Sequence, residues 1–148
     1  MDDSHQRPVS IWASVAATFY LWLGKTQRHF GIVGSDRHAF ERAIRHYSRA
    51  LQINPALAEA HLERGVLLWR ELDDSAAALL DLNAALRLRP GWPAALFCRG
   101  MANVSLGAYR DALADLLAYV ASDDREWRAD AARQIALIRD MVSPAGEG

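Results

Sequence analysis

The chain has 148 residues, of which 51% are hydrophobic and 24% are charged, and its formal net charge is −1. This length and composition predict one folded domain with its own hydrophobic core. The near-neutral charge argues against a dedicated nucleic-acid binder, which normally shows a basic excess. The single cysteine, Cys98, excludes an internal disulfide, and nothing points to an oxidising compartment.

The chain begins with a polar stretch, residues 1–8, which we expect to be flexible, and continues with an uncharged run at 9–24. A secretory signal is not expected, because Asp2 and Asp3 stand where such a signal carries positive charge. The run has 16 residues, whereas a helix that crosses a bilayer core usually needs about 20. We therefore interpret it as a long apolar first helix that packs on the rest of the fold.

Two alternatives for this run stay open. Its tryptophans stand near its two ends, as aromatic residues do at membrane interfaces, and its apolar face would also suit a second copy of the chain. If the run spans a membrane, the basic residues that follow it place the rest of the chain on the cytoplasmic side. The candidate residues for contact with a membrane or in a homodimer are Ile11, Trp12, Val15, Phe19 and Trp22.

Three segments farther along recur with a period of about 34 residues, which is typical of a helical repeat. They are AIRHYSRALQINP at 43–55, ALLDLNAALRLRP at 78–90 and ALADLLAYVASDD at 112–124. Each opens on an alanine, and two helices that cross about 8–10 Å apart need small residues at the crossing. Pro55 and Pro90 end a helix in two of the units. Because no window alternates as a strand does, we predict an all-α fold.

These residues resemble the tetratricopeptide repeat (TPR), a helix–turn–helix unit of about 34 residues that stacks into a right-handed solenoid. Besides Ala43, Ala78 and Ala112, the resemblance rests on Gly65 and Gly100. It also rests on the LGAY sequence that begins at residue 106, in which the glycine suits a left-handed turn. The third repeat matches best, whereas the second has an aspartate where a glycine is usual.

The resemblance implies a domain organisation of three repeats followed by one further helix. The repeats are 9–55, which is degenerate, 56–90 and 91–124. Residues 125–142 carry an apolar stripe and are expected to form a capping helix, because an open-ended solenoid needs a polar outer face. Residues 143–148 are expected to be a flexible tail.

No pattern of catalytic or metal-binding residues stands out in the sequence. The five histidines show neither the HExxH spacing nor a pairing with cysteine. Cys98 has no neighbour that would activate its thiol, and neither a nucleophile–base pair nor a carboxylate dyad is singled out. We therefore expect a protein that is not an enzyme and needs no metal or cofactor.

In the TPR family, the first helix of each pair lines a groove that commonly holds a peptide or helix of a partner protein. The family pattern implies a groove formed by Glu59, Leu62, Val66 and Trp69 of the second repeat and Ala94, Phe97, Met101 and Val104 of the third. Some family members bind acidic C-terminal tails through lysines and asparagines, whereas this groove is expected to be apolar. An apolar groove suits an amphipathic helix or an extended hydrophobic segment. We expect its residues to face solvent in the free protein.

Three functional hypotheses follow from the resemblance. The first, which we favour, is a cytoplasmic adaptor or scaffold that binds a helix or apolar segment of a partner protein, and no nucleic acid. The second is an accessory subunit of a membrane complex, anchored by residues 9–24 with its repeats in the cytoplasm. The third is a small chaperone for secreted or assembling clients.

Overall fold

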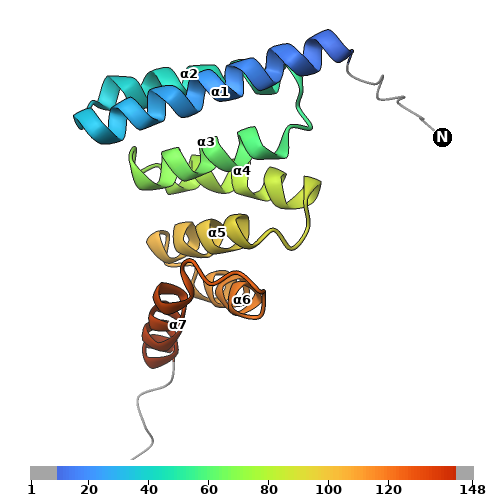
Figure 1. The fold of residues 1–148 in the computed structure, drawn as a ribbon. Coiled ribbons are helices and arrows are strands. Elements are labelled where there is room, and N and C mark those ends of the chain that lie inside the picture. Colours follow the sequence, from blue (N-terminus) through green and yellow to red (C-terminus); the bar gives the residue numbers. More distant parts are fainter. Residues whose placement is uncertain (1–9, 143–148) are drawn as a thin grey trace, which may run out of the picture.

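The computed structural model describes residues 10–142, which form seven α-helices and contain no strand. The helices are α1 (Ile11–Gly34), α2 (Arg37–Ile53), α3 (Ala58–Arg70), α4 (Ser75–Leu88), α5 (Pro93–Ser105), α6 (Tyr109–Val120) and α7 (Arg128–Val142). For these residues, the predicted all-α solenoid is confirmed (Figure 1). The flexible ends predicted at 1–8 and 143–148 lie outside the described residues.

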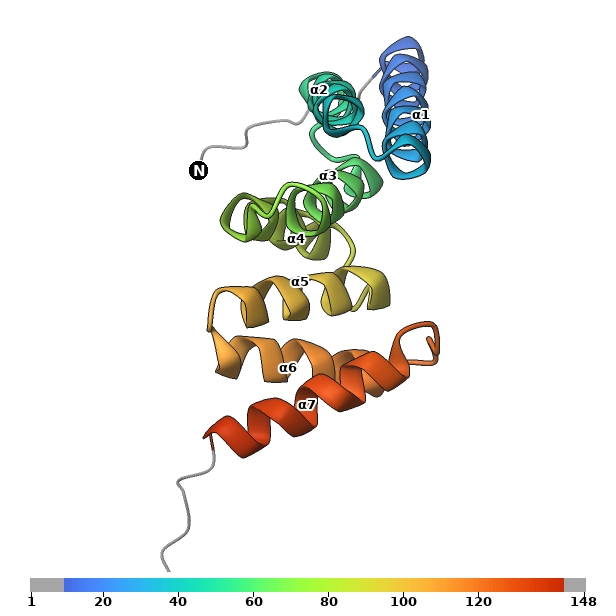
Figure 2. The same ribbon diagram turned by 90° about the vertical axis from the view of Figure 1, so that its left-hand side faces the viewer.

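The helices pack as three hairpins and a final single helix. The hairpins are α1 with α2, α3 with α4, and α5 with α6, and they contact one another through α2–α3 and α4–α5. The first helices also touch, α1 with α3 and α3 with α5. Figure 2 shows α7 at the end of the stack, running obliquely across α6. Each hairpin therefore packs mainly on its neighbours in sequence, as in other solenoids.

The turn between the two helices of a hairpin requires a left-handed residue. Gly107 has φ 72° in the turn between α5 and α6, which confirms the prediction from the sequence. One repeat earlier, Asp73 takes the same role with φ 55°, although a side chain disfavours this conformation. The next residue, Asp74, then caps α4, because its carboxylate accepts a hydrogen bond from the N–H of Ala77.

Glycines allow the two helices of a hairpin to approach closely. A Cβ added to Gly65 would lie 2.9 Å from Cγ of Leu82, and a Cβ on Gly100 would lie 2.9 Å from Cγ of Leu116. These distances are shorter than ordinary van der Waals contact, so only glycine fits without a shift. The recurrence of Gly65 and Gly100 thus has a packing cause.

In the degenerate first repeat, Gly24 has the same role. A Cβ added to Gly24 would overlap the ring of Tyr47, which holds the repeat position of Leu82. Gly24 and Gly65 are 41 residues apart, whereas Gly65 and Gly100 are 35 apart. The longer spacing is the reason that the period did not reveal the first helix of this repeat.

The hydrophobic core extends along the stack as two clusters. One joins α1, α2 and α3 around the fully buried Tyr47 and Leu67. The other runs from α3 to α7 around Leu82, Leu116 and Tyr119. Because α7 contributes Ala131, Ile135 and Ile138 to the second cluster, it covers the end of the third hairpin.

Candidate partner-binding groove

A groove with a volume of about 650 Å³ lies between the first helices of the second and third hairpins and the start of α7. We call it the α3–α5–α7 groove. Its lining residues are Arg28, Leu62, Glu63, Val66, Trp69, Arg70, Ala94, Phe97, Cys98, Met101, Glu126, Trp127, Asp130 and Gln134. Because α3 and α5 are first helices of their pairs, the groove lies where the TPR resemblance implies a binding surface.

The structure brings most of the residues that the family pattern implied into this groove. Six of them line it, namely Leu62, Val66, Trp69, Ala94, Phe97 and Met101. Glu59 lies outside the lining and pairs with Lys25 of α1. Val104 is also outside the lining and packs against the larger core cluster.

The expectation that these residues face solvent is wrong for Leu62 and Phe97, which are 8% and 6% exposed. Leu62 belongs to the larger core cluster, and Phe97 is covered by the segment before α7. The ring of Trp127 stacks on that of Phe97, with centroids 5.0 Å apart and an interplanar angle of 16°. The floor of the groove therefore belongs to the core, while Val66, Trp69 and Met101 above it are half-buried.

Trp127 was not among the residues predicted for the groove, and Tyr119 holds it in place. The buried hydroxyl of Tyr119 accepts a hydrogen bond from the N–H of Trp127 and donates one to Asp124, each 2.8 Å long. These bonds fix the turn between α6 and α7. The sequence signal for this side of the groove was Trp127 itself, an aromatic residue inside the predicted capping helix 125–142, which directly precedes α7 in the structure.

The charged residues of the groove include three carboxylates and two guanidiniums. Arg28 lies 3.4 Å from the carboxylate of Glu63, so one pair is already neutralised. Glu126 and Asp130 stand on the α7 side, where Asp130 pairs with Arg133 at 2.6 Å, and Arg70 is the remaining cation of the lining. The groove thus combines an apolar floor with charged sides, on which Glu126 is the carboxylate outside these ion pairs.

Cys98 lines the groove as a buried thiol. Burial raises the pKa of its thiol to about 12, so the thiol stays protonated at neutral pH. Over residues 10–142, no group of three or more His, Cys, Asp or Glu side chains is placed to hold a metal ion. The groove therefore offers shape, apolar surface and charge for binding.

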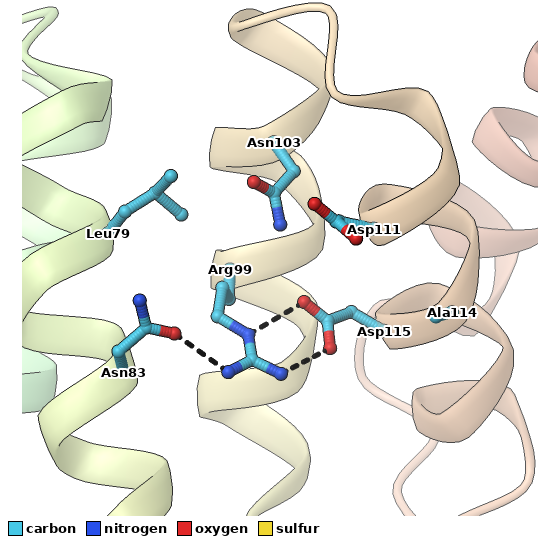
Figure 3. Close-up of a pocket in the computed structure, with 7 residues that line it drawn as sticks. All are labelled: Leu79, Asn83, Arg99, Asn103, Asp111, Ala114 and Asp115. Atoms are coloured by element: carbon cyan, nitrogen blue, oxygen red, sulfur yellow. Dashed lines mark hydrogen bonds and ion pairs between the residues drawn. The ribbon is translucent and has the colours of Figure 1, made fainter.

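Figure 3 shows a second, polar hollow of about 330 Å³, formed by α4, α5 and α6. In it, the guanidinium of Arg99 donates two hydrogen bonds to the carboxylate of Asp115, at 2.7 and 2.8 Å, and a third to Asn83, at 2.8 Å. The arginine thus ties α5 to α6 within its hairpin and to α4 of the preceding one. We interpret this hollow as a structural joint.

The same joint occurs one repeat earlier. Arg64 donates two hydrogen bonds to Asp81, at 2.7 and 2.8 Å, and one to Ser48, at 2.9 Å. These joints were not predicted from the sequence, although each arginine directly precedes a glycine of the repeat. In the first repeat, Leu23 precedes Gly24, so that repeat lacks the arginine.

The residues considered for membrane or dimer contact lie along one side of α1, and all of them are exposed: Ile11, Trp12, Val15, Phe19 and Trp22. The opposite side of α1 packs on α2 through Ala17, Leu21, Gly24 and Gly31. None of the helices between residues 10 and 142 is both long and apolar enough to cross a membrane.

These features define a helical-hairpin solenoid whose groove has an apolar floor and charged sides. Comparison with known proteins shows what its repeat resembles. Residues 36–71, which include α2 and α3, match the family model of the TPR repeat. A FAM10 family protein of Arabidopsis thaliana is 36% identical over 77 residues, which cover 52% of this chain and 17% of that protein. The matched part therefore corresponds to less than a fifth of that relative's length.

Solved TPR domains have the same fold. The first TPR domain of Spaghetti (RPAP3), bound to an HSP90 peptide, has a TM-score of 0.74 and 19% identity, and covers 88% of this chain and 96% of that one. The TPR domain of Arabidopsis OM64 has a TM-score of 0.73 and 22% identity, with coverages of 88% and 99%. The chain thus has the fold of a TPR domain, and its residues 36–71 match the TPR repeat.

Proposed function

We propose that the protein is a non-catalytic cytoplasmic adaptor that binds an apolar or amphipathic segment of a partner protein in the α3–α5–α7 groove. The observation that carries this proposal is the groove's apolar floor with half-buried side chains above it. Trp69 and Met101 offer an aromatic anchor and an adaptable contact, the side chains that dominate many binding sites. The volume of about 650 Å³ accommodates several side chains of a bound segment.

Similar domains support a protein segment as the class of ligand. The first TPR domain of Spaghetti was solved with the HSP90 peptide SRMEEVD. The TPR2B domain of yeast Sti1 was solved as a complex with pHsp70. The peptide SRMEEVD ends in acidic residues, whereas the groove of this chain carries more carboxylates than guanidiniums. Charge complementarity therefore favours an apolar segment that also carries a basic residue next to Glu126, because Asp130 already pairs with Arg133.

The test uses labelled synthetic peptides whose binding is measured by fluorescence anisotropy. We expect an 18-residue amphipathic helix of leucine and lysine to bind at least 10-fold more tightly than its leucine–glutamate counterpart or SRMEEVD. Tighter binding of SRMEEVD than of the leucine–lysine peptide would contradict the proposed chemistry.

Variants locate the binding surface. Met101→Lys should weaken binding of the leucine–lysine peptide at least 10-fold, because a positive charge on this half-buried groove residue opposes apolar contact and repels the lysines of the peptide. Met141→Lys on the exposed side of α7 is the matched control and should leave the affinity unchanged. Equal weakening by both variants would place binding outside the groove. Leu62 and Phe97 are unsuitable for this test, because a charge at these buried positions would destabilise the fold.

A further inference from the structure

The outer side of α1 is a continuous apolar stripe that faces away from its packing partner α2. Its members are Ile11, Val15, Phe19, Trp22, Phe30 and Val33, whose exposed fractions lie between 54% and 80%. They follow one another at three or four residues, with Thr26 between Trp22 and Phe30, so they share one helix face. We call this surface the α1 stripe.

The area of the α1 stripe is large for a surface that faces water. An aromatic side chain has about 150–250 Å² to bury, so the six side chains together expose roughly 600–800 Å² of apolar surface. The largest apolar patch on an ordinary monomer is about 300–600 Å². A stable interface of standard size buries about 800 Å² on each partner. The stripe, with Trp12 beside it, therefore has the area that one protein partner covers.

Charge makes the stripe compatible with an identical copy. The helix α1 contains no acidic residue, and its lysine and arginine, Lys25 and Arg28, pair with Glu59 and Glu63 of α3, while its histidine, His29, is exposed. No stripe residue is ionisable, so two stripes meet without repulsion between like charges. Binding of the helix to an anionic membrane would instead favour free lysines or arginines beside the stripe, and the two cations of α1 are already paired.

An antiparallel pair centred near Trp22 places apolar residues opposite each other at both ends of the stripe and Phe19 opposite Thr26. The helix runs from residue 11 to residue 34, so Trp22 stands close to its midpoint. In an antiparallel pair, Ile11 would lie opposite Val33 of the second copy, and Val15 opposite Phe30. The rings of Phe19 and Trp22, stacked with centroids 6.1 Å apart, would lie next to the two-fold axis. Such an interface is isologous, and the dipoles of the two helices oppose each other.

We propose that the α1 stripe binds a second copy of this chain, which gives a homodimer through antiparallel α1 helices. The contact lies on the side of α1 that faces away from α2. The α3–α5–α7 groove, which takes only Arg28 from α1, stays open in each copy. The proposal is therefore independent of what the groove binds.

Analytical ultracentrifugation of the full chain tests the dimer. We expect a mass of twice 16.4 kDa at micromolar concentration, and the monomer mass for Trp22→Glu, with Val15→Glu as a second variant. Leu80→Glu is the matched control, because Leu80 is 74% exposed on α4, outside the stripe. It should stay dimeric with an unchanged helical circular dichroism spectrum. A monomeric wild type, or an assembly that Trp22→Glu does not dissociate, would overturn the proposal.

Cross-linking tests the direction of the helices. A mixture of the Val15→Cys and Phe30→Cys variants should form the mixed disulfide on oxidation, whereas Val15→Cys alone should not cross-link. Efficient cross-linking of Val15→Cys to itself would show a parallel pair and refute the antiparallel contact. Flotation with phosphatidylcholine–phosphatidylglycerol vesicles completes the test. A wild-type monomer that floats with the vesicles, and loses flotation on Trp22→Glu, would assign the stripe to membranes.

Discussion

Two buried tyrosines carry their hydroxyl groups in opposite environments. The hydroxyl of Tyr119 makes two hydrogen bonds of 2.8 Å. The hydroxyl of Tyr47 has no hydrogen-bond partner among the described residues. Burial, and then the nearby carboxylate of Glu63, raises the pKa of Tyr47, so its hydroxyl stays neutral. The hydroxyl of Tyr119 therefore stabilises the fold, whereas burial of the Tyr47 hydroxyl without a partner costs desolvation free energy.

Removal of the hydroxyl should have opposite effects at the two sites. Tyr119→Phe should lower the free energy of unfolding by about 1–3 kcal/mol, because the N–H of Trp127 loses its partner. Tyr47→Phe should leave it unchanged or raise it by about 1 kcal/mol, because an unpaired polar group leaves the core. Urea unfolding followed by circular dichroism measures both. Equal destabilisation by the two changes would show that Tyr47 has a partner after all.

Gly24 should tolerate no side chain. Gly24→Ala should lower the free energy of unfolding by about 1–3 kcal/mol, because its methyl group would overlap the ring of the fully buried Tyr47. Gly34→Ala is the control, since a Cβ there would have only Asp36 within 4 Å, at ordinary contact distance. Thermal melts followed by circular dichroism measure both variants, and Gly34→Ala should be neutral or stabilising. Equal stability of the two variants would refute Gly24 as the crossing residue of the first repeat.

At the scale of helices, the arginine–aspartate joints connect successive hairpins. Burial by itself raises the pKa of Asp81, but hydrogen bonds from His61 and Arg64 outweigh it and hold the pKa below its usual value. A carboxyl group with a lowered pKa stabilises the fold above the pKa of the unfolded chain, which is about 3.9. That contribution is lost as the pH falls through the lower folded-state pKa.

The change Asp81→Asn should reveal this contribution. At pH 7 we expect a loss of about 2–4 kcal/mol, because the charge of Arg64 loses its buried partner. The difference from wild type should shrink as the pH is lowered from 5 to 2, in urea melts at each pH. Asp140→Asn on the exposed side of α7 should leave the pH profile unchanged. A difference that stays constant down to pH 2 would show that Asp81 is not ionised in the fold.

For the whole molecule, stability is close to a sum of hairpins and the contacts between neighbours. Removal of residues 1–35 takes away α1 and uncovers Phe40, Ala43 and Tyr47 of α2. The remaining fragment should aggregate, or melt more than about 10 °C lower, in differential scanning calorimetry. A soluble fragment of equal stability, with the full chain in the membrane fraction, would restore the interpretation of residues 9–24 as an anchor.

Local signals in the sequence determined the architecture. The recurring alanines and glycines, together with Pro55 and Pro90, predict helical hairpins because crossing geometry and helix ends depend on a few neighbouring residues. The left-handed turn at Gly107 follows from the same kind of signal. The family pattern also pointed to helix faces, and six of the eight implied residues line one groove.

Contacts between distant residues decided what these signals left open. Phe97 is buried because Trp127, 30 residues farther along the chain, stacks on its ring, and no period in the sequence encodes that distance. Gly24 has its role only through the ring of Tyr47 on another helix. From the sequence alone, the residues of the α1 stripe could equally form the buried face of the helix. In the structure, Ala17 and Leu21 pack against α2, and the stripe faces outward because a helix that buries one face exposes the opposite one.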